Sequence, residues 1–352
     1  MRWGWVGMVS RPIRMDQNEN PLGPSGFAVS VLRRFADSVH RYDCGEMRAL
    51  QEKLQQRLVS PHGDRVSVCL GDGADHLLGL VCQAVLAEGG SILEPELSYG
   101  EASRIVLLMA HRTRLGCRAV RTPMCPDLGV DLWALARAVS PETRAIFLTN
   151  PNNPTGRFIG LERINEWLAS IPKEVIIVLD EAYIEFAAAD SRSSIRMAAR
   201  HENLVVIRTL SKVYGLAGLR LGYAIAIPAL LERVIPWKLG QPGSLVCLAA
   251  AAALDDDQHR ARTVLLASQF REKLQLTLEG HDVTLTPSQT NFVFFRAGQR
   301  TEQLIEALCE RGIRVARFDH QSTGTWLRVS SGTPEETDYL CEHLRTFLRT
   351  GG

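Results

Sequence analysis

One short segment, residues 208–220, combines residue types that can do covalent chemistry on amines and carbonyls. Lys212 stands between Thr209 and Ser211 on one side and Arg220 on the other, and apolar, strand-like runs flank the segment. A lysine amine attacks a carbonyl group when its surroundings favour the uncharged form. Hydroxyl and guanidinium groups bind a phosphate dianion, and a guanidinium can do so with two parallel hydrogen bonds. The segment therefore predicts a Schiff-base lysine beside a phosphate site, the two features that pyridoxal phosphate (PLP) needs.

Other polar segments that could bind a cofactor also follow apolar, strand-like runs. Strands that alternate with helical stretches indicate a parallel sheet covered by helices. Ligands of such sheets collect at the carboxyl ends of the strands. We therefore expect one site built from residues at these ends, namely Gly73, Ala74 and Asp75 in a glycine-rich turn, Asn153 in a proline-rich turn, Asp180 and Tyr183 after an unbroken apolar run, and Lys212.

Asp180 has a defined chemical use at such a site. The apolar run at residues 175–179 is typical of a strand buried on both faces, and a carboxylate at its exit needs a partner. The protonated ring nitrogen of PLP is such a partner, and Asp180 would keep that ring able to accept electrons. Tyr183 would donate a hydrogen bond to the phenolic oxygen of the cofactor. The alternative is that Asp180 only caps a following helix.

The glycine-rich turn predicts where a phosphate would lie. Residues 71–75 read Gly-Asp-Gly-Ala-Asp and lead into a predicted helix at residues 76–86. Backbone N–H groups and the helix dipole both favour an anion at a helix N-terminus. Together with Arg220, this turn is the predicted phosphate cradle.

Several of these motifs resemble one enzyme family. The sequence Thr-Leu-Ser-Lys…Gly-Leu-Ala-Gly-Leu-Arg-Leu-Gly-Tyr at residues 209–223 resembles the lysine motif of the class I/II aminotransferases, which are PLP enzymes of fold type I. Its wording is closest to the histidinol-phosphate aminotransferase branch. Residues 150–156 (Asn-Pro-Asn-Asn-Pro-Thr-Gly) and residues 18–21 (Asn-Glu-Asn-Pro) resemble further motifs of this family. The resemblance covers nearly the whole chain from Met15.

The resemblance implies roles for individual residues around the cofactor. Lys212 would hold PLP and then move the proton of the reacting carbon, and Asn153 would hydrogen-bond the phenolic oxygen. Tyr99 would stack on the pyridine ring, which any aromatic side chain can do. Tyr42 would reach the phosphate in the neighbouring subunit of a homodimer. Asp43 stands where the family usually has proline.

The resemblance also implies substrate residues and a substrate class. Asn20 would line the mouth of the site, Arg328 would grip a carboxylate, and Arg317 would meet a substrate phosphate; we expect both arginines to share one pocket. The substrates would be an amine or amino acid with a distal anion, with histidinol phosphate as the leading candidate, and 2-oxoglutarate/glutamate. The loop at residues 238–244 lacks the asparagine that the family often carries, which leaves the amine open.

Other interpretations remain open at this point. Lys212 could be a lysine that packs at a strand end, and each arginine a surface residue in a salt bridge. A decarboxylase of the threonine-phosphate type shares the scaffold. A catalytically idle relative that serves as a binding subunit is a different class, and the presence of both Lys212 and Asp180 argues against it.

The predicted fold class is α/β, with a mostly parallel, helix-covered sheet and a smaller α+β domain. We expect an N-terminal arm and part of the small domain in residues 1–40, the large PLP-binding domain in residues 41–255, and the C-terminal small domain in residues 256–352. Helices are predicted at 27–36, 47–58, 228–237, 245–254 and 258–278.

Composition restricts the partners. The 352 residues carry a formal net charge of +1 with no basic patch, so neither nucleic acid nor an anionic membrane is an expected partner. The 8 cysteines form no C-x-x-C pair and no zinc spacing, which predicts no metal site and favours a reducing cytoplasm. The apolar run at residues 3–9 lacks a clear cleavage site, so we predict no signal peptide.

Overall fold

The computed structural model describes residues 12–42, 44–59, 65–113, 115–188, 193–235 and 242–349. The predictions for residues 3–9, for Asp43 and for residues 238–241 lie outside these ranges. Within them, no helix is both long and apolar enough to cross a membrane.

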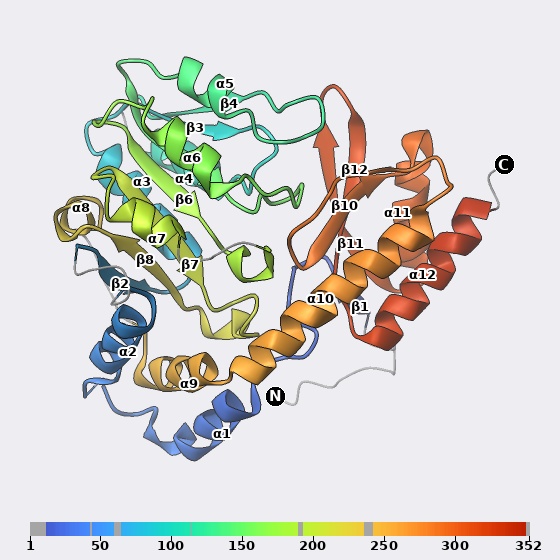
Figure 1. The fold of residues 1–352 in the computed structure, drawn as a ribbon, viewed down its shortest axis with the longest axis horizontal. Helices are drawn as coiled ribbons and strands as arrows, with labels where there is room; N and C mark the ends of the chain where they lie inside the picture. Colours follow the sequence, from blue (N-terminus) through green and yellow to red (C-terminus); the bar gives the residue numbers. More distant parts are fainter. Residues whose placement is uncertain are drawn as a thin grey trace.

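A seven-stranded sheet forms the larger half of the structure (Figure 1). Only β8 runs antiparallel to its neighbours; the other strands in the described part of this sheet are parallel, which confirms the predicted fold class. In spatial order the strands are β2 (Ser67–Gly71), β8 (Gly222–Ala226), β7 (Leu204–Thr209), β6 (Ile176–Asp180), β5 (Thr143–Thr149), β3 (Ser91–Pro95) and β4 (Arg118–Thr122).

Helices cover both faces of this sheet, so its central strands are buried throughout. All residues of β6 and β7 are buried, as expected for strands that are apolar on both faces. One apolar cluster joins the sheet to α3 (Ala74–Val85), α4 (Glu101–Arg112) and α8 (Pro228–Val234). Another joins the opposite face to α2 (Glu46–Leu54), α5 (Leu132–Arg137), α6 (Leu161–Leu168), α7 (Ser193–Ala198) and α9 (Ser244–Asp255).

A five-stranded sheet forms the smaller half, and it takes one strand from the N-terminal segment. β1 (Ile13–Met15) pairs in parallel with β11 (Ile313–His320), and the other pairs are antiparallel. The remaining strands are β12 (Gly324–Ser330), β10 (Phe292–Arg296) and β9 (Thr284–Leu285). Three helices cover one face through a shared apolar cluster, namely α10 (Asp257–Leu278), α11 (Thr301–Glu310) and α12 (Pro334–Arg349).

The long helix α10 runs between the two halves, from α9 toward the small sheet (Figure 1). Asp256 caps it, because its side chain accepts the backbone N–H of His259. A separate apolar cluster also joins the halves, with Leu97 and Leu128 on one side and Phe294 and Trp326 on the other. The N-terminal helix α1 (Gly26–Arg34) packs against α9 rather than against the small sheet.

Several elements differ from the sequence predictions. The predicted helix at residues 47–58 ends as an α-helix at Leu54 and continues as a π-helical turn, Gln55–Val59. β1, β4, α5, α6 and α7 were not predicted. The helices α5 and α7 have only six residues each, and β4 reads Arg-Ala-Val-Arg-Thr at the edge of its sheet. None of these three elements carries a clear apolar period in its sequence.

Gly222→Ala should disrupt the contact between β8 and the start of α3. A Cβ at residue 222 would lie 2.7 Å from the backbone nitrogen of Ala74, and backbone cannot retract as a side chain can. We expect the free energy of unfolding, measured in urea, to fall by about 2 kcal/mol. Gly218→Ala is the control, because a Cβ there has nothing within 4 Å. Equal stability of the two variants would contradict the close approach.

Candidate active site

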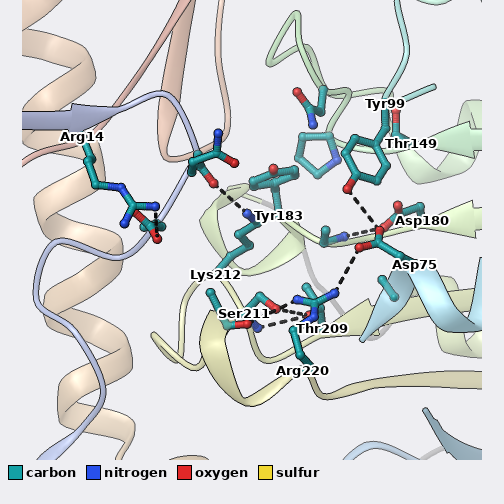
Figure 2. Close-up of a pocket in the computed structure, with 17 residues that line it drawn as sticks. Arg14, Asp75, Tyr99, Thr149, Asp180, Tyr183, Thr209, Ser211, Lys212 and Arg220 are labelled. Atoms are coloured by element: carbon teal, nitrogen blue, oxygen red, sulfur yellow. Dashed lines mark hydrogen bonds and ion pairs between the residues drawn. The ribbon is translucent and has the colours of Figure 1, made fainter. Parts of the chain in front are cut away.

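A cavity of about 280 Å³ opens where the carboxyl ends of the central strands face the N-terminal segment (Figure 2). It brings together ten of the predicted site residues, which are Ala74, Asp75, Tyr99, Asn153, Asp180, Tyr183, Thr209, Ser211, Lys212 and Arg220. Gly73 lies directly behind the cavity wall, because a Cβ on it would come within 2.5 Å of the Arg220 guanidinium. Predicted residues from the ends of separate strands therefore line one cavity.

Lys212 projects into the cavity from the loop that follows β7. Its Nζ donates a hydrogen bond of 3.1 Å to the carbonyl of Gln17 in the N-terminal segment. The same nitrogen lies 5.8 Å from the centre of the Tyr183 ring. This neutral acceptor leaves the amine free to exchange its contact for a covalent partner.

The lower part of the cavity in Figure 2 is an anion cradle. Gly73, with φ +89°, is the N-cap residue of α3, so the free N–H groups at the start of that helix lie close to the Arg220 guanidinium. Thr209 and Ser211 contribute hydroxyl groups, whose oxygens lie 2.9 Å apart. The carboxylate of Asp75 pairs with Arg220 at 3.0 Å. The cradle therefore offers hydroxyl, amide and guanidinium donors, which suits a phosphate dianion.

Asp180 lines the cavity at the end of β6 and needs a cationic or protonated partner. Burial raises the pKa of its carboxyl group from 3.8 to about 7, and the neighbouring carboxylates of Asp75 and Glu181 add to the effect. One oxygen accepts the backbone N–H of Ala182 at 3.0 Å. A ring N–H donor in the cavity would bind the other oxygen and favour the charged carboxylate.

Tyr99 and Tyr183 stand on the cavity wall in different settings. The Tyr99 hydroxyl donates to Asp75 at 3.1 Å, and burial together with that carboxylate raises the pKa of Tyr99. The Tyr183 ring packs edge-on against Phe292, with ring centres 5.1 Å apart. Its hydroxyl accepts a hydrogen bond of 2.8 Å from Asn18.

Arg328 comes from the small sheet and lies next to the cavity, in contact with the lining residue Asn153. Its side chain is 8% exposed, and the guanidinium contacts Asn153 Oδ1 and donates to the carbonyl of Asp16 at 2.6 Å. It also lies 5.3 Å from the ring centres of Phe292 and Phe318. Within the described residues it forms no ion pair, its Nε has no partner, and burial lowers its pKa. A buried, unpaired guanidinium of this kind is suited to bind a carboxylate.

Arg317 does not share this pocket, so that prediction is wrong. In the β11–β12 ladder Ala316 stands opposite Arg328, whereas Arg317 stands opposite Leu327. Side chains alternate along a strand, so Arg317 points to the helix-covered face. There it pairs with Glu302 at 2.8 Å and with Asp319 at 3.1 Å.

Asn20 and Tyr42 also lie outside the cavity. Asn20 is buried and donates to the Val213 carbonyl and to the Thr263 hydroxyl, which makes it a link between loop and helix rather than a wall of the mouth. Tyr42 is 96% exposed in the single chain. Neither residue therefore touches the site within this chain.

The sequence reasoning placed residues 18–21 at the mouth of the site through Asn20, but it did not single out the residues of β1 and of the following segment that line the cavity. Arg14, Gln17 and Glu19 line the cavity, and Arg14 pairs with Glu19 at 3.0 Å. Figure 2 shows Arg14 at the end of the cavity remote from Arg220. The resemblance at residues 18–21 marked this region, but only the parallel pairing of β1 with β11 brings it to the site.

A buried ion pair beneath the cavity was also missed. Arg208, the residue before Thr209, pairs with Glu181, the residue after Asp180, at 2.8 Å, and both side chains are fully buried. The Ser194 hydroxyl donates to the same carboxylate at 2.8 Å. The pair joins the strand end that carries Asp180 to the strand that leads to Lys212.

Comparison with known proteins identifies the family. The family described as aminotransferase class I and II matches residues 10–344. The histidinol-phosphate aminotransferase of Moorella thermoacetica is 31% identical, over 97% of this chain and 86% of its own. Histidinol-phosphate aminotransferase 2 of Ralstonia nicotianae is 35% identical, over 97% and 90%. The structure of histidinol-phosphate aminotransferase from Sinorhizobium meliloti in complex with pyridoxal-5'-phosphate matches with a TM-score of 0.85 at 27% identity, over 97% and 92%.

The chain therefore belongs to the class I and II aminotransferases. It is a PLP-dependent aminotransferase, and its fold is the fold type I architecture predicted from the motifs. The residues of the cavity fit the cofactor. The cradle beside Arg220 suits its phosphate, the buried carboxyl of Asp180 suits its ring nitrogen, and Lys212 suits its aldehyde.

Asp180→Asn should change how the stability of the cofactor-free chain depends on pH. Since the pKa of Asp180 is raised from 3.8 to about 7, the folded state keeps a proton that the unfolded state has lost within this window. The free energy of unfolding therefore falls as pH rises through the window, by roughly 2–4 kcal/mol from this group. The neutral variant lacks this fall. Urea unfolding of both chains from about pH 4 to about pH 8 measures it; parallel curves would show that Asp180 titrates normally.

Proposed function

We propose that this enzyme moves an amino group between an amine with a distal anion and the pair 2-oxoglutarate/glutamate. Histidinol phosphate is the leading amine, as the names of the relatives support. The observation that carries the proposal is Arg328, a buried guanidinium without an ion pair among the described residues, which contacts Asn153 on the wall of a cavity that also holds a lysine and a buried carboxyl. A substrate carboxylate beside the cofactor would provide an ion-pair partner for that guanidinium.

We assign the chemical roles as follows. PLP, when bound, supplies an electron sink for the reacting carbon of the substrate. Asp180 holds a proton on the ring nitrogen, and Asn153 and Tyr183 hold the phenolic oxygen. Tyr99 covers the ring. Lys212 would take the proton from the substrate Cα, because its amine lies in the same cavity as the reacting carbon.

The test separates the two half-reactions. The PLP-loaded enzyme is mixed with histidinol phosphate, and the visible absorption of the lysine-bound cofactor is followed; 2-oxoglutarate is then added. We expect the band to disappear and then to return with formation of glutamate. Lys212→Ala should abolish this cycle and the adduct that borohydride traps on the lysine. Release of carbon dioxide from an amino-acid substrate without glutamate would support the decarboxylase instead.

The distal anion requires a cation other than Arg317. Arg14, Lys212 and Arg220 are the cationic side chains that line the cavity, and the last two serve the cofactor in this proposal. Arg14 is half-exposed, and so is its partner Glu19. An exposed pair of this kind contributes little to stability, so a substrate anion can replace Glu19 at small cost. We therefore assign the distal anion to Arg14.

Arg14→Gln should weaken discrimination between histidinol phosphate and histidinol, which lacks the phosphate. We expect the ratio of the two kcat/KM values to fall by about tenfold, since one charge-assisted hydrogen bond is lost. Arg317→Gln is the matched control and should leave the ratio unchanged, because Arg317 lies on the opposite face of the small sheet. An unchanged ratio in Arg14→Gln would place the anion elsewhere, and a low ratio in the wild type would exclude the phosphorylated amine.

We further propose a homodimer with shared sites, in which Tyr42 reaches the phosphate of the neighbouring subunit. Its 96% exposure supports this, together with exposed apolar side chains of the same N-terminal stretch, Leu22, Phe27 and Val39. Sedimentation of a fully active monomer would exclude it.

Eight free cysteines support a cytoplasmic location. The two sheets support the proposed division into residues 1–40, 41–255 and 256–352, and β1 agrees with the proposal that residues 1–40 contribute part of the small domain.

A further inference from the structure

Asn18 occupies an unusual position behind the cavity. It is 1% exposed and has φ +53°, in the left-handed region that asparagine tolerates better than most residues. It does not line the cavity, and the chemistry assigned so far does not use it. A buried, left-handed asparagine that touches a site residue calls for a physical reason.

The side-chain amide of Asn18 is fixed at both ends. Its Nδ2 donates to Tyr183 Oη at 2.8 Å, and its Oδ1 accepts from Ser330 Oγ at 2.8 Å. Ser330 Oγ also accepts the backbone N–H of Asn18 at 2.9 Å. Because the serine hydroxyl has a single hydrogen and gives it to Oδ1, the amide nitrogen must face the tyrosine.

This contact restricts the Tyr183 hydroxyl. The edge-on packing of Phe292 holds the Tyr183 ring, so rotation of the O–H bond is the freedom that remains. A phenol donates one hydrogen bond, and a donor that occupies one side of its oxygen directs the hydrogen to another side. Tyr183 lines the cavity, so an acceptor in the cavity can receive it.

We propose that Asn18 is a positioning residue that directs the Tyr183 hydroxyl hydrogen toward the phenolic oxygen of PLP. The proposal rests on the role of Tyr183 under the proposed function but not on the identity of the amine. The anchor of Asn18, Ser330, follows Arg328 by two residues on β12, so both side chains lie on the same face of the small sheet. Asn18 thus ties Tyr183 to the strand that carries the carboxylate-binding arginine.

The test is a pH titration of the visible absorption of the PLP-loaded enzyme. A donor to the phenolic oxygen stabilises its negative charge, so the proton shared between that oxygen and the Lys212 nitrogen is held less tightly. Loss of the donor should therefore raise the titration midpoint. We expect a rise of about 0.5–1 pH unit in Asn18→Gly, the size that one hydrogen bond supports. Glycine is chosen because it accepts positive φ without strain.

Tyr183→Phe separates positioning from a merely structural role. That variant should raise the midpoint by itself, and Asn18→Gly should add no further rise in the Tyr183→Phe background. Asn20→Ala is the matched control, because Asn20 is a buried residue of the same segment without a contact to Tyr183. It should lower stability and leave the midpoint unchanged.

Ser330→Ala is a second variant that spares the left-handed backbone. It removes the anchor of the amide and should raise the midpoint by a smaller amount, again only when Tyr183 is present. An unchanged midpoint in Asn18→Gly, or in Ser330→Ala if the former does not fold, would overturn the proposal. So would an equal rise in the Tyr183→Phe background. Failure of amino transfer in the wild type would instead contradict the proposed function, because the titration needs no substrate.

Discussion

A carboxyl group buried at the end of an apolar strand is the constraint on which the site depends. Every residue of β6 is buried, and Asp180 closes it with a pKa that burial raises to about 7. A charged carboxylate at this place is costly until a protonated partner meets it. In the proposed function, the protonated ring nitrogen of PLP is that partner. The buried pair of Arg208 and Glu181 holds the neighbouring strand ends together, so Asp180 and Lys212 keep fixed positions relative to each other.

The main features of the fold could be predicted from the sequence because its long elements carry strong periodic signals. The central strands are unbroken apolar runs, and α10 begins at a run of aspartates that ends the preceding helix. The three residues of β1 carry no such signal, and their place in the small sheet depends on pairing with β11. Short polar elements such as β4 are defined by their neighbours in space rather than by their own sequence.

Asp180 and Lys212 were predictable, because in each case one sequence motif holds both the reactive side chain and the apolar run of the strand that precedes it. A site residue was not predictable where its position depends on which face of a strand its side chain occupies. Arg317 stands one position from Ala316, the partner of Arg328, and this single step turns its side chain to the helices. Counting the alternation in both strands could have indicated this. Asn18 needed the tertiary structure, since its partners lie 165 and 312 positions away in the chain.

In the proposed function, Asp180 is the group that keeps the PLP ring nitrogen protonated. Nitrogen-15 NMR of the enzyme loaded with PLP labelled at that nitrogen tests this directly, because the chemical shift reports whether the nitrogen carries a proton. We expect a protonated nitrogen in the wild type near neutral pH and an unprotonated nitrogen in Asp180→Asn, with the cofactor bound in both. An unprotonated ring nitrogen in the wild type, or the same protonated state in both enzymes, would contradict the account.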